Sequence, residues 1–137
     1  MLCELLANLR VVRRGLSIDF GGSWVLPRLI GMHRAKELAL LGEIISAKEA
    51  AELGLVNRVV PADQLDAVVG EWAARLAAGP PIALSMTKRL VSESFNVTME
   101  EALEAEGLAQ TVNNATEDAR EAIKAFLEKR EPRFIGK

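Results

Sequence analysis

Residues 21–61 read GGSWVLPRLIGMHRAKELALLGEIISAKEAAELGLVNRVVP, and the helix boundaries in this stretch decide the fold class. Ser23 follows a glycine pair and is expected to cap a helix, because a serine oxygen can accept a hydrogen bond from a free N–H of the first turn. A second short helix is expected over about residues 34–41, ending at Gly42, since glycine commonly follows the last residue of a helix. The stretch therefore predicts short helices in close succession.

A capping box and a valine-rich segment complete this stretch. Residues 46–49, Ser-Ala-Lys-Glu, place a serine and a glutamate three positions apart, so that each side chain can bond the backbone N–H of the other. The helix that they open is expected to end at Gly54. Residues 55–60 lie between Gly54 and Pro61 and are β-branched, which predicts a short strand.

Residues 63–137 predict a succession of longer helices. Asp63 is expected to cap the first of them, and Gly79 with the prolines after it to end that helix. Pro81 suits the first turn of the next helix. The first helix has one apolar stripe at helical spacing, expected to face a core, which comprises Leu65, Val68, Val69, Trp72 and Leu76.

Two further helix starts follow. Residues 98–101, Thr-Met-Glu-Glu, form a second capping box and open a helix to about Asn113. Thr116 precedes two acids and starts the last helix, which is expected to end at Pro132. The apolar face of this last helix comprises Ala119, Ala122, Ile123, Phe126 and Leu127. The residues alone therefore predict a mainly α fold with one or two short β elements.

The composition excludes several classes of function. The chain has 137 residues, 50% of them hydrophobic, and a net charge of −2 with both signs interspersed, so neither nucleic acid nor a membrane surface is an expected partner. No apolar run approaches the ~20 residues of a membrane span, and the start lacks the layout of a signal peptide, so a cytoplasmic location is expected. The single cysteine, Cys3, excludes an internal disulfide and a multi-cysteine metal site, and no metal is expected.

Asp19 and the glycine pair after it are the strongest candidate site among the residues. Gly21 and Gly22 can adopt backbone conformations closed to other residues and let a ligand or a chain approach closely. They precede a helix N-terminus, whose free N–H groups attract polarised oxygen atoms, and Asp19 lies where a carboxylate could face such an atom. On the residues alone, a loop aspartate that forms a local turn is the favoured interpretation, and a functional carboxylate is the alternative.

Other chemistry-bearing residues give weaker indications. His33 is the only histidine, and a structural role is expected for it. Cys3 has no histidine near it in the sequence to activate it as a nucleophile. Arg10, Arg13 and Arg14 are expected to form a solvated face. The chain contains neither a phosphate-binding loop nor a dinucleotide fingerprint.

The run from residue 21 to residue 61 resembles the enoyl-CoA hydratase/isomerase superfamily, also called the crotonase superfamily, very closely. The resemblance continues through PPIALSMTK at residues 80–88 and EDAREAIKAFLEKR at residues 117–130, and it covers about residues 15–137. The segment DFGGSW and the ending KREPRFIGK are most similar to the acyl-CoA isomerase branch, which includes the ring-epoxide isomerases of phenylacetate breakdown.

This resemblance implies the C-terminal part of the ClpP/crotonase-like α/β spiral fold, including its helical trimerisation region. Residues 1–14 match poorly, residues 15–62 correspond to the end of the crotonase core with its acyl-pocket loop, and residues 63–137 to the helical oligomerisation region. A homotrimer or homohexamer is the implied assembly. The composition also suggests self-association, because a chain without tyrosine and with 4% aromatic residues needs an aliphatic core that another chain can complete.

The chemistry that the resemblance implies is that of a thioester enzyme without a separate cofactor, since coenzyme A enters as part of the acyl-CoA substrate. Family members hold the thioester carbonyl between two backbone N–H groups, which stabilises the enolate formed when the neighbouring carbon loses a proton. Asp19 falls where the isomerase branches place a catalytic aspartate, and it is expected to shuttle this proton. Gly21, Gly22 and Trp24 are expected to shape the acyl pocket.

Two C-terminal residues are implied in coenzyme A binding. Phe126 and Lys129 match positions that contact the CoA nucleotide bound to a neighbouring subunit in the family. The spacing of Phe126 also fits a residue that faces the core. Near the start of the match, Ile18 replaces a proline that is common in the family, which affects the rigidity of the loop.

Three functions are compatible with these observations. Double-bond isomerisation is favoured, because the position of a hydratase glutamate falls at Val11 when counted back from Gly15, and a valine cannot transfer a proton. The family places both oxyanion segments in its N-terminal half, before the match to Arg14, so only trace activity is expected from these 137 residues alone. The alternatives are a catalytically silent helical assembly fragment and an enoyl-CoA hydratase whose catalytic acids lie on the N-terminal half.

Overall fold

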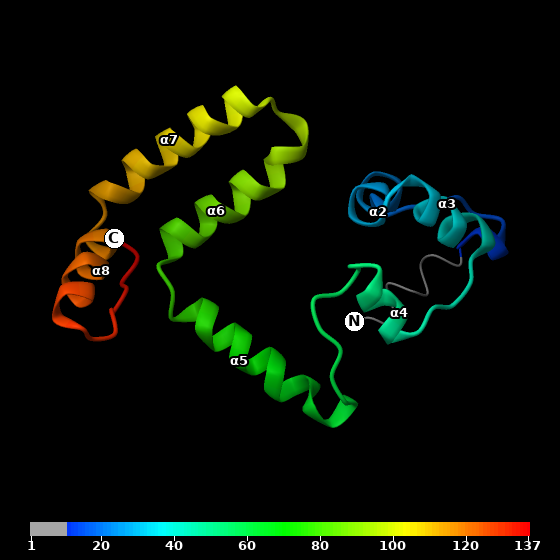
Figure 1. The fold of residues 1–137 in the computed structure, drawn as a ribbon, viewed down its shortest axis with the longest axis horizontal. Coiled ribbons are helices and arrows are strands. Elements are labelled where there is room, and N and C mark those ends of the chain that lie inside the picture. Colours follow the sequence, from blue (N-terminus) through cyan, green and yellow to red (C-terminus); the bar gives the residue numbers. More distant parts are fainter. Residues whose placement is uncertain (1–10) are drawn as a thin grey trace. The chain divides into compact units, whose positions relative to one another are not determined.

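A computed structural model describes residues 11–137, and the chain divides into two compact units between Ala62 and Asp63 (Figure 1). In the first unit the described elements are a 3-10 turn η1 (Val11–Arg14) and the helices α2 (Gly22–Ile30), α3 (Met32–Leu41) and α4 (Ala47–Glu52). No helix in the described part of the chain is long and apolar enough to cross a membrane.

The core of the first unit forms where α2 meets α3. Leu26 from α2 packs with Ala35 and Leu38 from α3, and all three are buried. Partly buried aliphatic side chains surround this cluster, namely Ile18, Ile30, Ile45, Leu53 and Leu55. The short helices are therefore held by a few leucine-sized contacts rather than by their own length, since isolated helices this short are marginal in water.

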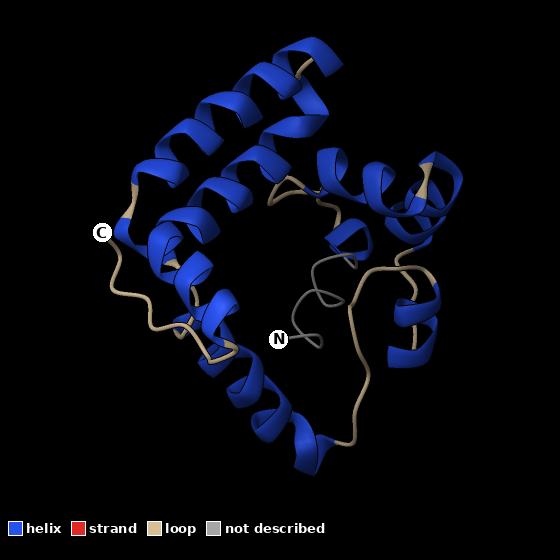
Figure 2. Cartoon of the chain, turned by 60° about the vertical axis from the view of Figure 1, so that its left-hand side comes forward, coloured by secondary structure: helices blue, strands red, loops and turns tan. Residues whose placement is uncertain are grey.

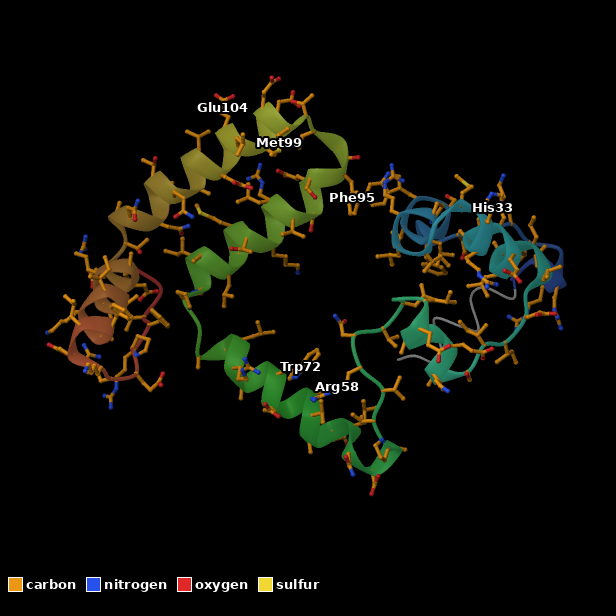
Figure 3. The ribbon with its side chains drawn as sticks, in the orientation of Figure 1. His33, Arg58, Trp72, Phe95, Met99 and Glu104 are labelled. Atoms are coloured by element: carbon orange, nitrogen blue, oxygen red, sulfur yellow. The ribbon has the colours of Figure 1, made fainter. Side chains whose placement is uncertain are left out.

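The second unit, from Asp63 to Lys137, is a succession of helices. A 3-10 turn η2 (Ala62–Gln64) leads into four α-helices and a second turn, which are α5 (Leu65–Ala77), α6 (Pro81–Glu93), η3 (Ser94–Asn96), α7 (Met99–Ala115) and α8 (Glu117–Glu128). In Figure 1, α6 and α7 run side by side in opposite directions, and α8 follows α7 after one residue. Phe95 and Met99 lie at the connection between α6 and α7 (Figure 3).

Both capping boxes form as the sequence predicts. The N–H of Glu49 donates to Ser46 Oγ at 3.2 Å, and the N–H of Ser46 donates to Glu49 Oε2 at 2.7 Å. Thr98 and Glu101 repeat this arrangement at the start of α7 with the same two distances. These hydrogen bonds keep the pKa of both glutamates below the ordinary value, because they favour the ionised carboxylate. The predicted C-terminal Gly42 of α3 and the first-turn Pro81 of α6 are also confirmed.

Three predicted helix boundaries are wrong. Ser23 lies inside α2, whose N-cap is Gly21, and no side chain caps that helix. Asp63 does not cap α5, because a 3-10 turn precedes the helix and places Gln64 at its N-cap. The last helix ends at Glu128, ahead of Pro132, because Lys129 adopts a left-handed conformation that stops it.

The predicted strand at residues 55–60 is also wrong. These residues form bends and irregular backbone, and Figure 2 shows helices and loops with no strand over residues 11–137. A strand exists only when its N–H and C=O groups pair with a neighbouring strand, and the described part of the chain supplies none. The valines of this segment favour extended backbone, but here the segment forms no hydrogen bonds of a β-sheet.

The apolar faces of α5 and α8 lie mostly at the surface of this chain. The predicted stripe of α5 is exposed at Leu65, Val69, Trp72 and Leu76. On α8, Phe126 has 82% of its surface exposed, so the core-facing interpretation of this residue is wrong within this chain, and Ala125 is buried in its place. The periodicity groups these apolar residues on one side of each helix, but within this chain those sides are not the buried ones.

The C-terminal residues fold back along α8 and bond to its first turns (Figure 1). The buried carboxylate of Asp118 accepts hydrogen bonds from the N–H groups of Ile135 at 2.7 Å and Gly136 at 2.9 Å. The N–H groups of Glu117 and Asp118, at the start of α8, donate to the Lys137 carbonyl oxygen at 2.6 and 3.1 Å. Free donors at the helix start are thereby satisfied by the chain's own tail.

An ion-pair cluster closes the same loop at the other end of the tail. Arg130 donates to both carboxylate oxygens of Glu121, from Nη1 at 2.6 Å and from Nη2 at 3.0 Å, and its Nε donates to Glu128 at 2.6 Å. The N–H of Arg133 donates to Glu121 as well, at 3.1 Å. The hydrogen bonds from Arg130 and Arg133 lower the pKa of the Glu121 carboxyl to about 2.

This pKa predicts a pH dependence of stability. The Glu121 carboxylate favours the folded state, so its contribution is fully present above the ordinary pKa of 4.5 and is lost as the pH falls from 4.5 through about 2. We expect Glu121→Gln to lower the urea midpoint at pH 7, and the difference from the unmodified chain to shrink as the pH falls below 4.5. Glu104→Gln, at an exposed position of α7 (Figure 3), is the control and should show no such convergence. A difference for Glu121→Gln that is the same at pH 7 and at low pH would contradict the prediction.

Candidate functional site

The candidate site is a tight turn that joins the η1 segment to α2. Phe20 has φ 51° and Gly21 has φ 73°, so two consecutive residues adopt left-handed backbone. The N–H of Gly22 donates to the carbonyl oxygen of Asp19 at 2.8 Å, which closes the turn. A left-handed conformation is costly for a residue with a side chain, by about 1–3 kcal/mol, so Phe20 stores strain directly beside Asp19.

Gly22 leaves room for a close approach of the Ile18 side chain. A Cβ atom at Gly22 would lie 2.9 Å from two carbon atoms of the Ile18 side chain, closer than carbon atoms pack. Ile18 in turn packs against the core of α2 and α3. The absence of a side chain at Gly22 therefore lets Ile18 fold under the turn and anchor it. This isoleucine, which replaces the proline of the resemblance, holds the loop by packing.

Asp19 lies between the packed Ile18 and the left-handed Phe20, and its side chain is exposed. Within residues 11–137, its carboxylate takes part in no hydrogen bond or ion pair, while its backbone carbonyl is fixed by Gly22. A carboxylate on a constrained backbone with its oxygens uncommitted is suited to accept and return a proton. The predicted loop aspartate is therefore held in place by the turn.

Trp24 lies in the first turn of α2 and is 40% exposed. The guanidinium carbon of Arg28 stands 3.9 Å from the centroid of the Trp24 ring. Nη1 of Arg28 also donates to the Trp24 carbonyl oxygen at 2.9 Å. This partner of Trp24 was missed in the sequence, although the two residues stand four positions apart, a spacing that places side chains on one face of a helix.

The two remaining predicted residues belong to the second unit. Phe126 projects from α8 with 82% of its surface exposed, and Lys129, also exposed, ends that helix with φ 53°. They are three positions apart, on the last turn of α8 and its C-cap. The structure thus groups Asp19, Gly21, Gly22 and Trp24 in one turn and helix start, and Phe126 with Lys129 at the end of α8.

The weaker candidates remain outside this site. Val11 is buried in η1, with 8% of its surface exposed. His33 is exposed on α3 (Figure 3), and Arg13 donates to the carbonyl oxygen of Leu41 at 3.1 Å. Cys3 and Arg10 lie outside the described residues. In the part of the chain that the structure describes, no group of three acidic, histidine or cysteine side chains is arranged to hold a metal.

A family model described as enoyl-CoA hydratase/isomerase matches residues 8–137. The chain belongs to the enoyl-CoA hydratase/isomerase family. The match includes the Asp19 turn as well as α8 with its folded-back tail, so both groups of predicted residues lie within it. The crotonase fold class that the sequence suggested is confirmed, and the chain corresponds to the C-terminal half of its relatives.

Curated relatives of both reaction types match this family member about equally well. The 1,2-epoxyphenylacetyl-CoA isomerase of Escherichia coli K12 is 38% identical over 90% of this chain and 47% of its own length. The crotonyl-CoA hydratase of Syntrophomonas wolfei is 37% identical over the same shares, 90% and 47%. The chain thus spans about half the length of the relatives it matches, and identity does not separate an isomerase from a hydratase.

Solved structures agree with this family assignment. An enoyl-CoA hydratase from Geobacillus kaustophilus matches with a TM-score of 0.88 at 37% identity, over 93% of this chain and 48% of that one. An enoyl-CoA hydratase from Bacillus anthracis gives a TM-score of 0.89 at 38% identity, over 93% and 50% of the two chains.

The left-handed turn beside Asp19 generates a test with an internal control. Gly21→Ala should destabilise the chain by about 1–2 kcal/mol, because a left-handed conformation is costly for any residue with a Cβ. Gly70→Ala, inside α5, should instead stabilise it by roughly 0.5–1 kcal/mol, since alanine loses less entropy in a helix. Added Cβ atoms at both positions would meet nothing within 4 Å, so the two changes differ in backbone conformation and not in space.

The measurement is the urea midpoint of each variant. Equal shifts of the same sign for Gly21→Ala and Gly70→Ala would show that the turn is not held in the left-handed conformation.

Proposed function

We propose that this segment belongs to an enzyme that moves a double bond in an acyl-CoA thioester, with Asp19 as the residue that carries the proton. The observation that supports this most directly is the position of Asp19. Its carboxylate is exposed and uncommitted within residues 11–137, and a strained turn and a packed isoleucine fix its backbone.

The proposed reaction needs one proton carrier. Asp19 removes a proton from the carbon next to the thioester carbonyl of a 3-enoyl-CoA, and the electron pair of that C–H bond delocalises onto the carbonyl oxygen. Asp19 then returns the proton to the fourth carbon, so that the double bond moves from between carbons three and four to between carbons two and three. No atom is gained or lost. The oxyanion of the intermediate needs hydrogen-bond donors, usually the largest contribution to such catalysis.

The contrast with Val11 favours isomerisation over hydration. Hydration needs one group to activate water and another to protonate carbon, and the family resemblance places one such glutamate at Val11. The Val11 side chain is aliphatic and buried, with 8% of its surface exposed. A single carboxylate at Asp19 is sufficient for a proton shuttle but leaves hydration one group short in these residues.

The remaining site residues take supporting roles in this proposal. Gly21 and Gly22 bring backbone close to the acyl group, and Trp24 lines the acyl pocket with an aromatic face. Phe126 and Lys129 contact the nucleotide portion of coenzyme A bound by a second subunit, since an exposed aromatic ring and an exposed ammonium group suit an adenine base and a phosphate. Coenzyme A is part of the substrate, and no other cofactor is needed.

The two alternatives are separated by the products formed. A hydratase gives a 3-hydroxyacyl-CoA from a 2-enoyl-CoA, whereas an isomerase gives only the shifted alkene. A silent assembly fragment gives neither product and exchanges no substrate proton with heavy water. The 137 residues alone are expected to give at most trace turnover, because the family resemblance implies that both oxyanion donors lie in the N-terminal half. Rates near those of whole relatives would show that this half builds its own oxyanion hole.

Asp19→Asn tests the proposal in a protein that carries this segment together with the half found in its relatives. The change keeps the shape of the side chain and removes the proton carrier, so turnover of a 3-enoyl-CoA should fall by ~10²–10⁴-fold while the dissociation constant for coenzyme A stays nearly unchanged. Asp63→Asn, at an exposed position in η2, is the matched control and should keep full activity. Unchanged turnover in Asp19→Asn would remove this residue from the mechanism.

We further propose that the chain self-associates, as a trimer or a dimer of trimers. The support is the amount of apolar surface that it leaves exposed, which in the second unit includes Trp72, Leu76, Phe126 and Leu127. Large apolar side chains left exposed on several helices favour a surface that another chain covers. Sedimentation equilibrium at micromolar concentration should therefore show a species larger than 14.9 kDa. A well-folded monomer would contradict self-association and leave the Asp19 chemistry untouched.

A further inference from the structure

The guanidinium of Arg28 lies over an aromatic ring, a contact that differs from the ion pairs of several other arginines in the described chain. Arg34, Arg75, Arg89 and Arg130 each lie within ion-pair distance of a glutamate. Arg28 forms no such pair with the residues that the structure describes. Its guanidinium lies instead over the Trp24 ring, 3.9 Å from the ring centroid.

A second contact fixes the guanidinium while it stacks. Nη1 donates to the carbonyl oxygen of Trp24, one helical turn back, at 2.9 Å. The guanidinium is planar, so a hydrogen bond from one of its nitrogens to a helix backbone leaves little freedom for the plane as a whole. Backbone and ring of the same residue are thus held by one side chain.

This arrangement restrains the Trp24 ring. Trp24 is 40% exposed, and a cation over one face of its indole favours a single orientation of the ring. Arg28 covers one face of the ring, and by favouring one orientation it fixes the direction of the exposed part of the indole. An aromatic ring that keeps one orientation in a pocket discriminates between ligands of different size better than a ring that rotates.

We propose that Arg28 is a positioning residue that sets the orientation of the Trp24 ring and thereby the length of acyl chain that the site accepts. This inference rests on the proposed role of Trp24 in the acyl pocket. Arg28 itself need not touch the thioester, because its effect passes through the ring that it covers.

The matched variants are Arg28→Met, which keeps the length of the side chain and removes its charge, and Arg28→Lys, which keeps the charge but not the planar fork. Both are made together with Trp72→Phe, since the chain has two tryptophans and this change leaves Trp24 as the only emitter. Arg34→Met is the control, because Arg34 is an exposed helix arginine that pairs with Glu37 and not with a ring.

The first measurement is the fluorescence anisotropy of Trp24 in the free 137-residue chain. Arg28→Met should lower the anisotropy and shift the emission, and Arg28→Lys should do so in part, whereas Arg34→Met should match the parent. Unchanged anisotropy in Arg28→Met, with normal helix content by circular dichroism, would overturn the proposal.

The second measurement titrates butyryl-CoA and decanoyl-CoA against the same emission in a protein that carries this segment with its other half. The ratio of the two dissociation constants should change by roughly two- to fivefold in Arg28→Met, the range that a cation–π contact at an exposed site corresponds to. Both constants rising equally, with Arg28→Lys like the parent and a strong dependence on salt, would mean that Arg28 acts on the phosphates of the thioester, and would overturn the proposal.

The design also separates this inference from the function on which it rests. If anisotropy falls in Arg28→Met but no thioester alters Trp24 emission in the parent, the ring restraint stands while Trp24 leaves the acyl pocket, and the selectivity role falls with it. If thioesters alter the emission and the chain-length ratio is the same in parent and variant, the pocket assignment stands and the role of Arg28 is wrong.

Discussion

The close approach of Ile18 to Gly22 is the constraint on which the first unit depends. Because Gly22 has no side chain, Ile18 can lie within 2.9 Å of the place where a Cβ would be and still reach the core of α2 and α3. The chain must reverse sharply between these two residues, and the left-handed Phe20 and Gly21 provide the reversal. Asp19 lies at the start of this reversal, and its side chain is exposed. The exposed carboxylate thus directly follows a residue that packs against the core.

The second unit is stabilised differently, by a loop of hydrogen bonds that closes on α8. Asp118 binds the tail near one end of the loop, and Glu121 with Arg130 binds it near the other. This polar closure fixes the exit of the chain from α8 at Lys129 while Phe126 stays exposed. Polar contacts thus order the position of the two residues proposed for coenzyme A, and the apolar surface of α8 is left for another partner.

The sequence predicted best what is decided within one turn of helix. Four confirmed boundaries depend on a few neighbouring residues each. They are the capping boxes at Ser46 and Thr98, the end of α3 at Gly42 and the start of α6 at Pro81. The strand at residues 55–60 depends on a neighbour that lies elsewhere, and it is absent from the described structure. Periodicity located the apolar side of α5 that carries Trp72 but did not predict its exposure, because burial depends on what packs against the helix.

The candidate site shows the same division. Gly21 and Gly22 were identified because glycine is needed where backbone conformation or space excludes other residues. Phe20 was not identified, since its left-handed backbone opposes the ordinary preference of a bulky residue, and only the packing of its neighbours imposes it. Arg28 was overlooked for another reason: the spacing that places it beside Trp24 was visible, but the same spacing is found in any helix with an arginine and an aromatic residue.

Relatives of nearly equal identity, 38% and 37%, carry isomerase and hydratase names, so overall similarity cannot decide the reaction of this family member. The decision lies in how many proton carriers surround the substrate, because hydration adds a water molecule and needs a group for each of its two parts, whereas isomerisation returns the proton that it removes. In the described residues Val11 is aliphatic and buried, and Asp19 is ionisable and exposed. The fold is common to both reactions, so the choice between them depends on the residues of the site and not on the fold.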